Sequence, residues 1–176
     1  MMERCMQMDT KQMDTKQQDT AGMRHRIVDI YEYMPVLIDI LQSGKEVNLT
    51  VTGSSMAPFL GHLRDTLIIS PVTEPFQRGD MVFFQRSSGA YVMHRIHHIN
   101  KKGELFIVGD AQQDIEGPIQ PQQVFGVIKK VIRKGKLIQK GDPLWNFFEK
   151  VWIRIVPLRP LCVHAATLLW KIRGKG

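Results

Sequence analysis

The sequence has few of the features that mark secreted, metal-binding or membrane-spanning proteins. Its two cysteines, Cys5 and Cys162, lie near opposite ends of the 176 residues, a spacing that fits neither a disulfide framework nor a cysteine metal site. No run approaches the ~18 consecutive apolar residues of a spanning helix. The first 25 residues are polar and lack the apolar core of a secretory signal. We therefore expect reduced thiols, no metal or other cofactor, and no clear transmembrane helix.

The charge of the chain is unevenly distributed. Hydrophobic residues make up 43% and charged residues 23%, which is typical of a globular protein with a real core. Residues 129–176 carry 12 Lys or Arg and 2 Asp or Glu, a net charge of +10, whereas residues 1–128 carry 12 and 15, a net charge of −3. A basic tail beside a nearly neutral body favours an anionic partner surface, either lipid headgroups or nucleic acid.

The first 44 residues divide into two parts. Residues 1–22 contain a five-residue repeat that fits neither helical nor strand periodicity, and they have too little apolar surface to fold, so we predict a disordered tail. Residues 23–44 form the second part, where apolar residues recur at spacings of three and four and Gly44 follows the last of them. This pattern predicts an amphipathic helix lying on the domain, with a kink or break at Pro35.

Residues 45–140 have the pattern of a mainly β domain. Residues 47–52 alternate apolar and polar side chains with period two, and short apolar runs follow at residues 66–70, 81–86, 90–99, 105–108 and 124–132. The Ser-Ser-Gly turn at residues 87–89 predicts a hairpin between the third and fourth runs. Short strands separated by Gly and Pro turns predict a closed or folded-over antiparallel β domain.

Residues 141–176 form a separate, basic tail with helical character. Trp145, Trp152 and Trp170 lie beside cations there, a composition typical of segments at a membrane interface. Packing onto the domain or onto a partner is the alternative, and a short membrane span is a third possibility. We predict contact with anionic lipid through residues 144–176, and no nucleic-acid partner.

One stretch suggests chemistry. The β-branched run that ends at Thr52 is followed by Gly53-Ser54-Ser55-Met56-Ala57-Pro58, in which a glycine and a proline flank two hydroxyl groups. Gly53 permits a tight turn and Pro58 fixes its own φ, so a serine here is held on a constrained turn just past a strand. A nucleophile is useful in such a place, although a plain serine-rich turn has the same composition.

Three later motifs follow in order: Gly79-Asp80-Met81, Met93-His94-Arg95-Ile96 and Val108-Gly109-Asp110-Ala111. Together with Gly-x-Ser-Met-x-Pro, they make residues 47–133 resemble the signal peptidase family, in the branch that pairs a serine with a histidine. The resemblance implies a folded-over antiparallel β domain and a serine endopeptidase that cleaves a peptide or leader sequence after small residues. Members normally carry an N-terminal transmembrane helix, which this sequence does not show.

The resemblance also implies roles for individual residues. Ser55 matches the nucleophile and His94 the base, and histidine needs little pKa adjustment to accept a proton near pH 7. Asp110 or Asp114 would orient His94, although Ala111 stands where the family has Asn. The Ser55 backbone N–H, with Ser54 as a second donor, would form the oxyanion hole, and Met56 and Pro58 would contact the substrate. His97 and His98 are rival bases.

Two other functions remain open from the sequence. One is a self-cleaving regulator like the LexA repressors, which share the fold but use lysine as the base; Ala21-Gly22 resembles the bond that they cut. The other is a peptide-binding scaffold without catalysis. We expect association with a membrane surface, but the sequence does not indicate which face of the membrane or which peptide substrate.

Overall fold

The computed structural model describes residues 30–72 and 75–162. The predicted repeat tail and Trp170 lie outside these residues. In chain order the elements are α1 (Ile30–Gln42), β1 (Val47–Thr50), β2 (Thr66–Ser70), β3 (Met81–Gln85), β4 (Tyr91–Ile99), β5 (Leu105–Val108), β6 (Glu116–Ile119), η1 (Pro121–Gln123), β7 (Val124–Arg133), β8 (Lys136–Gln139), α2 (Pro143–Asn146), η2 (Phe147–Val151), η3 (Trp152–Arg154) and η4 (Val156–Leu158). Within the described ranges, no helix has both the length and the apolar character to cross a membrane.

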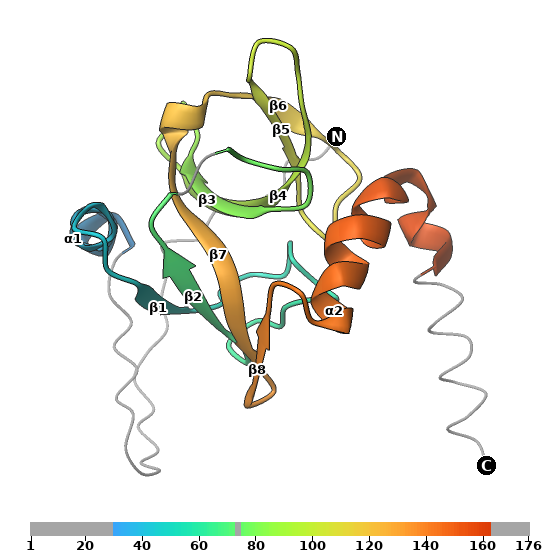
Figure 1. Cartoon of the computed structure of the whole chain (residues 1–176), viewed down its shortest axis with the longest axis horizontal. Helices are drawn as coiled ribbons and strands as arrows, with labels where there is room; N and C mark the ends of the chain where they lie inside the picture. The colour runs from blue at the N-terminus through green and yellow to red at the C-terminus, as the bar shows by residue number, and fades with distance from the viewer. Residues whose placement is uncertain (1–29, 73–74, 163–176) are drawn as a thin grey trace, which may run out of the picture.

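The strands form one antiparallel sheet of eight strands, which confirms the predicted mainly β class. The order is β1-β2-β7-β3-β4-β5-β6, and β8 pairs with β7 at residues 130–133, past the residues of β7 that pair with β3. At ten residues, β7 is long enough to pair with β2, β3 and β8 along its length. Figure 1 shows β7 crossing the molecule, with β3 to β6 curving around its upper part and β1, β2 and β8 below.

Periodicity predicted six of the eight strands and the β3–β4 hairpin. The two strands that it missed have unfavourable sequences. Gly117 and Pro118 occupy the middle of β6, and neither residue favours a strand interior. The four residues of β8 follow a tight turn in which Lys134 and Gly135 have positive φ angles of 51° and 75°. Pairing with β5 and with β7 stabilises these strands, because their own side chains provide little apolar surface.

Helix α1 packs its apolar side on the sheet, as predicted. Met34, Leu37 and Leu41 are buried, and α1 contacts β1 and β7. The helix continues through Pro35, so of the predicted kink or break at this proline the break is wrong. The Gly44 N–H donates to the Leu41 carbonyl at 2.9 Å with φ at +83°, which ends the helix as the sequence indicated.

Two buried apolar clusters lie on opposite sides of β3 and β4. The large core lies under α1 and the C-terminal helices, and its aromatic centre is Phe59, Trp145, Phe148 and Trp152. The small core is enclosed by β3 to β7 and consists of Val82, Phe84, Val92, Ile96, Leu105, Ile107, Ile119, Val124 and Val127. Successive residues of β4 therefore point alternately into the two clusters.

The described part of the C-terminal tail packs onto the domain. Trp145 and Trp152 are 2% and 6% exposed, and the Phe59 ring lies 5.7 Å from Trp145 and 4.9 Å from Phe148, centroid to centroid. Of the alternatives left open by the sequence, packing onto the domain is therefore the arrangement of residues 143–158. These two tryptophans belong to the core and are not available to a membrane surface.

Candidate functional site

Ser55 lies on a compact turn that follows β1. The Val51 N–H donates to the Asp65 carbonyl, and the Leu63 N–H donates to the Val51 carbonyl at 2.7 Å, which closes residues 51–65 into a loop. Gly53 has a φ of +82°, and its N–H donates to His62 Nδ1 at 2.8 Å. Ser54 is exposed and Ser55 is partly exposed. The turn therefore holds both hydroxyl groups near the surface, as the sequence predicted.

A second turn, Gly109–Gln112, lies directly against Ser55. The Ala111 N–H donates to the Ser55 carbonyl at 2.8 Å. A Cβ atom on Gly109 would come within 2.7 Å of the same carbonyl oxygen, so no larger residue fits there. The structure thus brings together two motifs that lie more than fifty positions apart in the sequence. Their contact is through the backbone, and it places the Gly-Asp-Ala motif beside the candidate nucleophile.

Asp110, at the centre of this turn, pairs with Arg95. Its two carboxylate oxygens accept hydrogen bonds from Arg95 Nε at 3.0 and 3.1 Å, and both side chains are fully buried. Burial raises the pKa of Asp110 above its ordinary value, while the Arg95 guanidinium opposes that shift. Arg95 also donates to the Gly79 carbonyl at 3.0 Å. The pair of Asp110 and Arg95 therefore connects three of the four motifs. The Asp110 carboxylate pairs with Arg95 and not with His94, the predicted partner.

His94 points to the other side of β4, into the small core. It is 1% exposed, pairs with Val82 across the strands, and has its ring 6.4 Å from that of Phe84. Burial, with a smaller contribution from Arg86, lowers its pKa from 6.5 to about 3, so the imidazole is neutral at pH 7. Among the described residues, neither ring nitrogen has a hydrogen-bond partner. The predicted hydrogen bonds from His94 to Ser55 and to Asp110 are thus not formed here.

The remaining predicted residues are dispersed. Asp114 is exposed between β5 and β6, while its neighbour Glu116 pairs with Arg86 at 2.6 Å. Met56 is 3% exposed in the large core, so its side chain is not free to contact a substrate. Pro58 is exposed. The structure therefore places Pro58, but not Met56, where a substrate has access.

The rival histidines lie on a distorted part of β4. The pairing of β4 with β5 shifts between Ile96 and His98, so the regular alternation of side chains along β4 is interrupted there. The Nδ1 atoms of His97 and His98 are 2.9 Å apart, and the His98 ring stacks on Phe106 at 4.4 Å. Sequence reasoning left His62 unassigned, yet it contacts the Ser55 turn through Gly53. Only the return of the chain after Pro58 brings it there.

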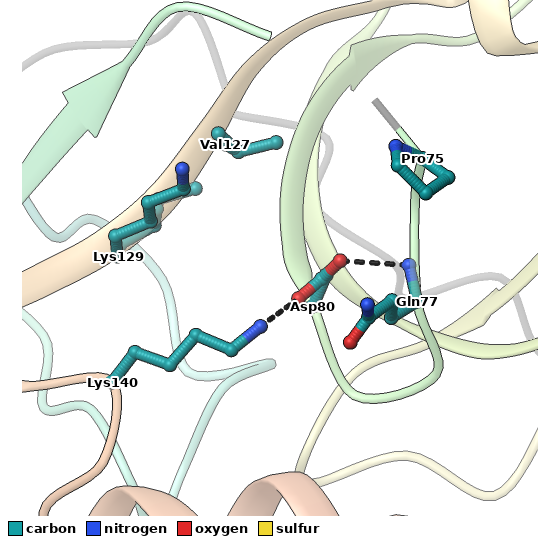
Figure 2. Close-up of a pocket in the computed structure, with 7 residues that line it drawn as sticks. Pro75, Gln77, Asp80, Val127, Lys129 and Lys140 are labelled. Carbon is teal, nitrogen blue, oxygen red and sulfur yellow. Dashed lines mark hydrogen bonds and ion pairs between the residues drawn. The ribbon is translucent and has the colours of Figure 1, made fainter. Parts of the chain in front are cut away.

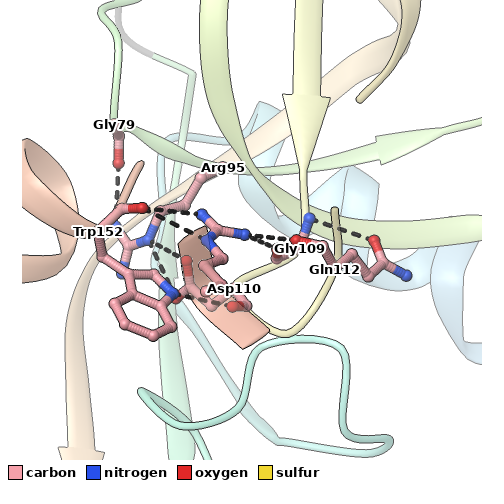
Figure 3. Close-up of polar contacts among 7 residues, drawn as sticks. Gly79, Arg95, Gly109, Asp110, Gln112 and Trp152 are labelled. Carbon is pink, nitrogen blue, oxygen red and sulfur yellow. Dashed lines mark hydrogen bonds and ion pairs between the residues drawn. The ribbon is translucent and has the colours of Figure 1, made fainter. Parts of the chain in front are cut away.

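Two residues that the sequence did not assign to the site complete the surroundings of Asp110. Trp152 Nε1 donates to the Asp110 carbonyl at 2.8 Å, and Arg159 Nη1 donates to the carbonyls of Gly109 and Gln112, both at 2.7 Å. Figure 3 shows Trp152 and Arg95 gathered around the Gly109–Gln112 turn. The position of Arg159 between two prolines was the one available signal, since an arginine in an apolar segment is frequently buried with polar partners.

A surface pocket of about 250 Å³ is lined by none of these residues (Figure 2). It is lined by Pro75, Gln77, Asp80, Val127, Ile128, Lys129 and Lys140. Lys140 Nζ lies 2.8 Å from an Asp80 oxygen and 3.1 Å from a Glu149 oxygen, so its charge is already paired. Among the residues that the structure describes, no group of three or more His, Cys, Asp or Glu could hold a metal ion. Neither observation connects to Ser55.

The chain matches no protein-family model, and no curated protein is significantly similar to it in sequence.

Proposed function

We propose that the protein is a serine endopeptidase resembling the signal peptidases, with a folded-over β domain of the signal-peptidase and LexA-peptidase type and with Ser55 as its nucleophile. The observation that carries the proposal is the direct contact between the Ser55 carbonyl and the Gly109–Gln112 turn. Through Asp110 and Arg95 this turn also connects to the Met-His-Arg-Ile and Gly-Asp-Met motifs. The four motifs thus meet at one place, although the strand pattern does not require them to meet. This meeting supports a shared site.

The position of Ser55 relative to β1 favours an extended peptide as substrate. In the described part of the chain β1 pairs with β2 alone and forms one end of the sheet. An extended peptide can add to such an edge through main-chain hydrogen bonds. Because Ser55 follows the last residue of β1 by five positions, a peptide aligned on β1 would pass close to the hydroxyl. This arrangement fits cleavage within a chain rather than of a compact small molecule.

In the proposed reaction, Ser55 Oγ attacks the peptide carbonyl carbon and its proton passes to His94. The backbone N–H of Ser55, with Ser54 as a second donor, stabilises the oxyanion. His94 then gives the proton to the leaving amine, and water hydrolyses the resulting acyl-enzyme by the same route. The neutral imidazole has no partner among the described residues and can accept a proton, but it lies on the face of β4 opposite Arg95, so this strand must rearrange before His94 reaches Ser55. The negative charge that develops on the oxyanion would raise the pKa of His94 in the transition state.

The test compares two adjacent serines. Ser55→Ala should lower cleavage of peptides with small residues before the cut by about 10³-fold or more, since nucleophile and base act as a unit. The comparison variant Ser54→Ala loses only the proposed second oxyanion donor and should keep more activity than Ser55→Ala. An acylating inhibitor should label the intact protein at Ser55, as mass spectrometry of the modified peptide would show. Full activity of Ser55→Ala would refute the nucleophile, and reversed phenotypes would show that Ser54 is the nucleophile.

A peptide-binding scaffold is the second candidate, because neither ring nitrogen of His94 has a hydrogen-bond partner among the described residues. The base is tested with His94→Leu and with His62→Gln, which alters the histidine that contacts the Ser55 turn. Loss of cleavage in His94→Leu alone supports the proposed pair, whereas loss in His62→Gln alone transfers the role to His62. A protein that binds peptides but neither cleaves them nor reacts with an acylating inhibitor is the scaffold.

We also propose that the C-terminal segment contacts an anionic membrane surface, through side chains other than the expected tryptophans. The tryptophans at 145 and 152 are buried, but four apolar side chains of the same segment are between 43% and 67% exposed: Phe147, Val151, Leu158 and Leu161. Lys150 and Arg154 are exposed between them. Apolar side chains interleaved with cations suit the boundary between headgroups and acyl chains.

A further inference from the structure

The Gly109–Gln112 turn is held by side chains that come from two distant parts of the chain. Arg95 reaches it from β4, and Arg159 and Trp152 reach it from the C-terminal helices. Within the turn, the Gln112 N–H donates to the Gly109 carbonyl at 3.1 Å, and Gln112 Oε1 accepts from the Gly109 N–H at 3.2 Å. The turn is compact, but these internal bonds do not determine where it lies relative to Ser55.

Arg159 provides the most extensive of the external contacts. Its side chain is 3% exposed, although the exposed Leu158 and Leu161 lie close to it in the sequence. Nη1 donates to two carbonyls of the turn at 2.7 Å, while Nε and Nη2 face the Trp152 carbonyl at 3.4 and 3.2 Å. The guanidinium also lies 5.5 Å from the centre of the Trp152 ring. A buried arginine whose donors bind three backbone carbonyls fixes the relative positions of those carbonyls.

Trp152 strengthens the same connection from a second atom. Its indole N–H donates to the Asp110 carbonyl at 2.8 Å, so the carbonyls of Gly109, Asp110 and Gln112 all accept hydrogen bonds from one helical segment. In the same turn, the Ala111 N–H donates to the Ser55 carbonyl. These hydrogen bonds therefore connect the position of the C-terminal helices to the position of the serine.

We propose that Arg159 and Trp152 are positioning residues for Ser55, which makes the C-terminal helical segment part of the active site. The inference rests on the proposed function for its catalytic meaning. Each residue acts by holding the turn whose Ala111 N–H donates to the Ser55 carbonyl. A displacement of about 1 Å at a reacting group can lower a rate by about 10²-fold. The segment would thus affect catalysis even though it contributes no reacting group.

The test uses Arg159→Lys, which keeps the charge but removes the planar group that reaches three carbonyls. We expect acylation of Ser55 by an inhibitor, and kcat for a peptide, to fall about 10- to 100-fold with KM little changed. Trp152→Phe removes only the indole donor and should give a smaller fall of the same kind. Arg154→Lys is the control. Arg154 is exposed on the same segment, and the hydrogen bond described for its side chain goes to the Lys150 carbonyl rather than to the turn.

A second measurement does not depend on catalysis. Amide hydrogen exchange at Ala111 should be faster in Arg159→Lys than in the intact protein, relative to amides of β3 and β4 in the same sample. Unchanged exchange together with an unchanged acylation rate would overturn the inference. If Ser55→Ala proved fully active, the proposed function would fail, yet faster exchange at Ala111 would still support the contact between Arg159 and the turn. A general loss of stability would accelerate exchange in β3 and β4 equally, and that result would also overturn a specific role.

Discussion

Replacing His94 with leucine should remove part of the acid sensitivity of the fold. Burial lowers the pKa of His94 to about 3 in the folded protein, against the ordinary value of 6.5 that we expect in the unfolded chain. Between these values the unfolded chain binds one proton more than the folded protein does. His94 therefore costs the fold no stability through protonation above pH 6.5. The free energy of unfolding decreases as the pH falls from 6.5 towards 3.

The magnitude follows from the same two values. When the unfolded chain binds one proton more than the folded protein, the free energy of unfolding falls by about 1.4 kcal/mol for each unit by which the pH falls. At pH 5, about 1.5 units below the ordinary histidine value, the intact protein should have lost about 2 kcal/mol on account of His94. Leucine cannot titrate, so His94→Leu should lack this loss. At pH 8 it should be at least as stable as the intact protein, because two buried nitrogens without partners among the described residues are removed.

Urea unfolding followed by circular dichroism at pH 8, 6 and 5 measures the effect. Val92→Ala is the matched control: Val92 lies on the same face of β4 in the small core, so its truncation should destabilise the protein without changing the pH dependence. If the intact protein and His94→Leu lost the same free energy between pH 8 and pH 5, the histidine would be accessible to protons in the folded state. The buried, neutral imidazole on which this reasoning depends would then be wrong.

Two further predictions concern the C-terminal segment. A Cβ on Gly79 would lie 2.4 Å from the Glu149 carbonyl oxygen, whereas one on Gly89 meets open space, and both glycines have a φ near +90° (+92° and +88°). Gly89→Ala should therefore lower the free energy of unfolding by about 1 kcal/mol, and Gly79→Ala should lower it by at least about 2 kcal/mol more. Thermal unfolding measures both losses. Equal losses would contradict the close packing of η2 against Gly79. For the membrane proposal, Leu158→Ser combined with Leu161→Ser should weaken sedimentation with vesicles that contain anionic lipid, and salt should weaken binding of the intact chain. Leu137→Ser, at an equally exposed leucine on β8, is the control, and unchanged binding of the double variant would refute the proposed lipid surface.

Local pattern was sufficient where a segment buries its own apolar face. Six strands, the β3–β4 hairpin and the end of α1 at Gly44 follow from periodicity and turn chemistry, because each of these features is decided within about ten residues. Strands β6 and β8 were missed since their stability comes from pairing with β5 and β7. Pairing of this kind depends on residues that are distant in the sequence, which no local window contains.

The candidate site divides in the same way. The motifs around Ser55 and Asp110 are visible in the sequence, and the alternation of β4 requires that His94 and Arg95 point to opposite sides. Which side faces Asp110 depends on how the Gly109–Gln112 turn returns to the sheet, and in the structure it is the side of Arg95. The predicted contact between Asp110 and His94 failed for this reason. The pKa of His94 likewise depends on burial, which the residue type does not specify.

The C-terminal segment shows most clearly what composition leaves undetermined. Tryptophans beside cations suit both a membrane interface and a helix that packs on a domain, because the same amphipathic side chains serve both environments. The folded chain selects the second environment, because Phe59 lies against Trp145 and two carbonyls of one turn accept hydrogen bonds from Arg159. Composition specifies which side chains can be buried there, and the fold supplies the surface that buries them.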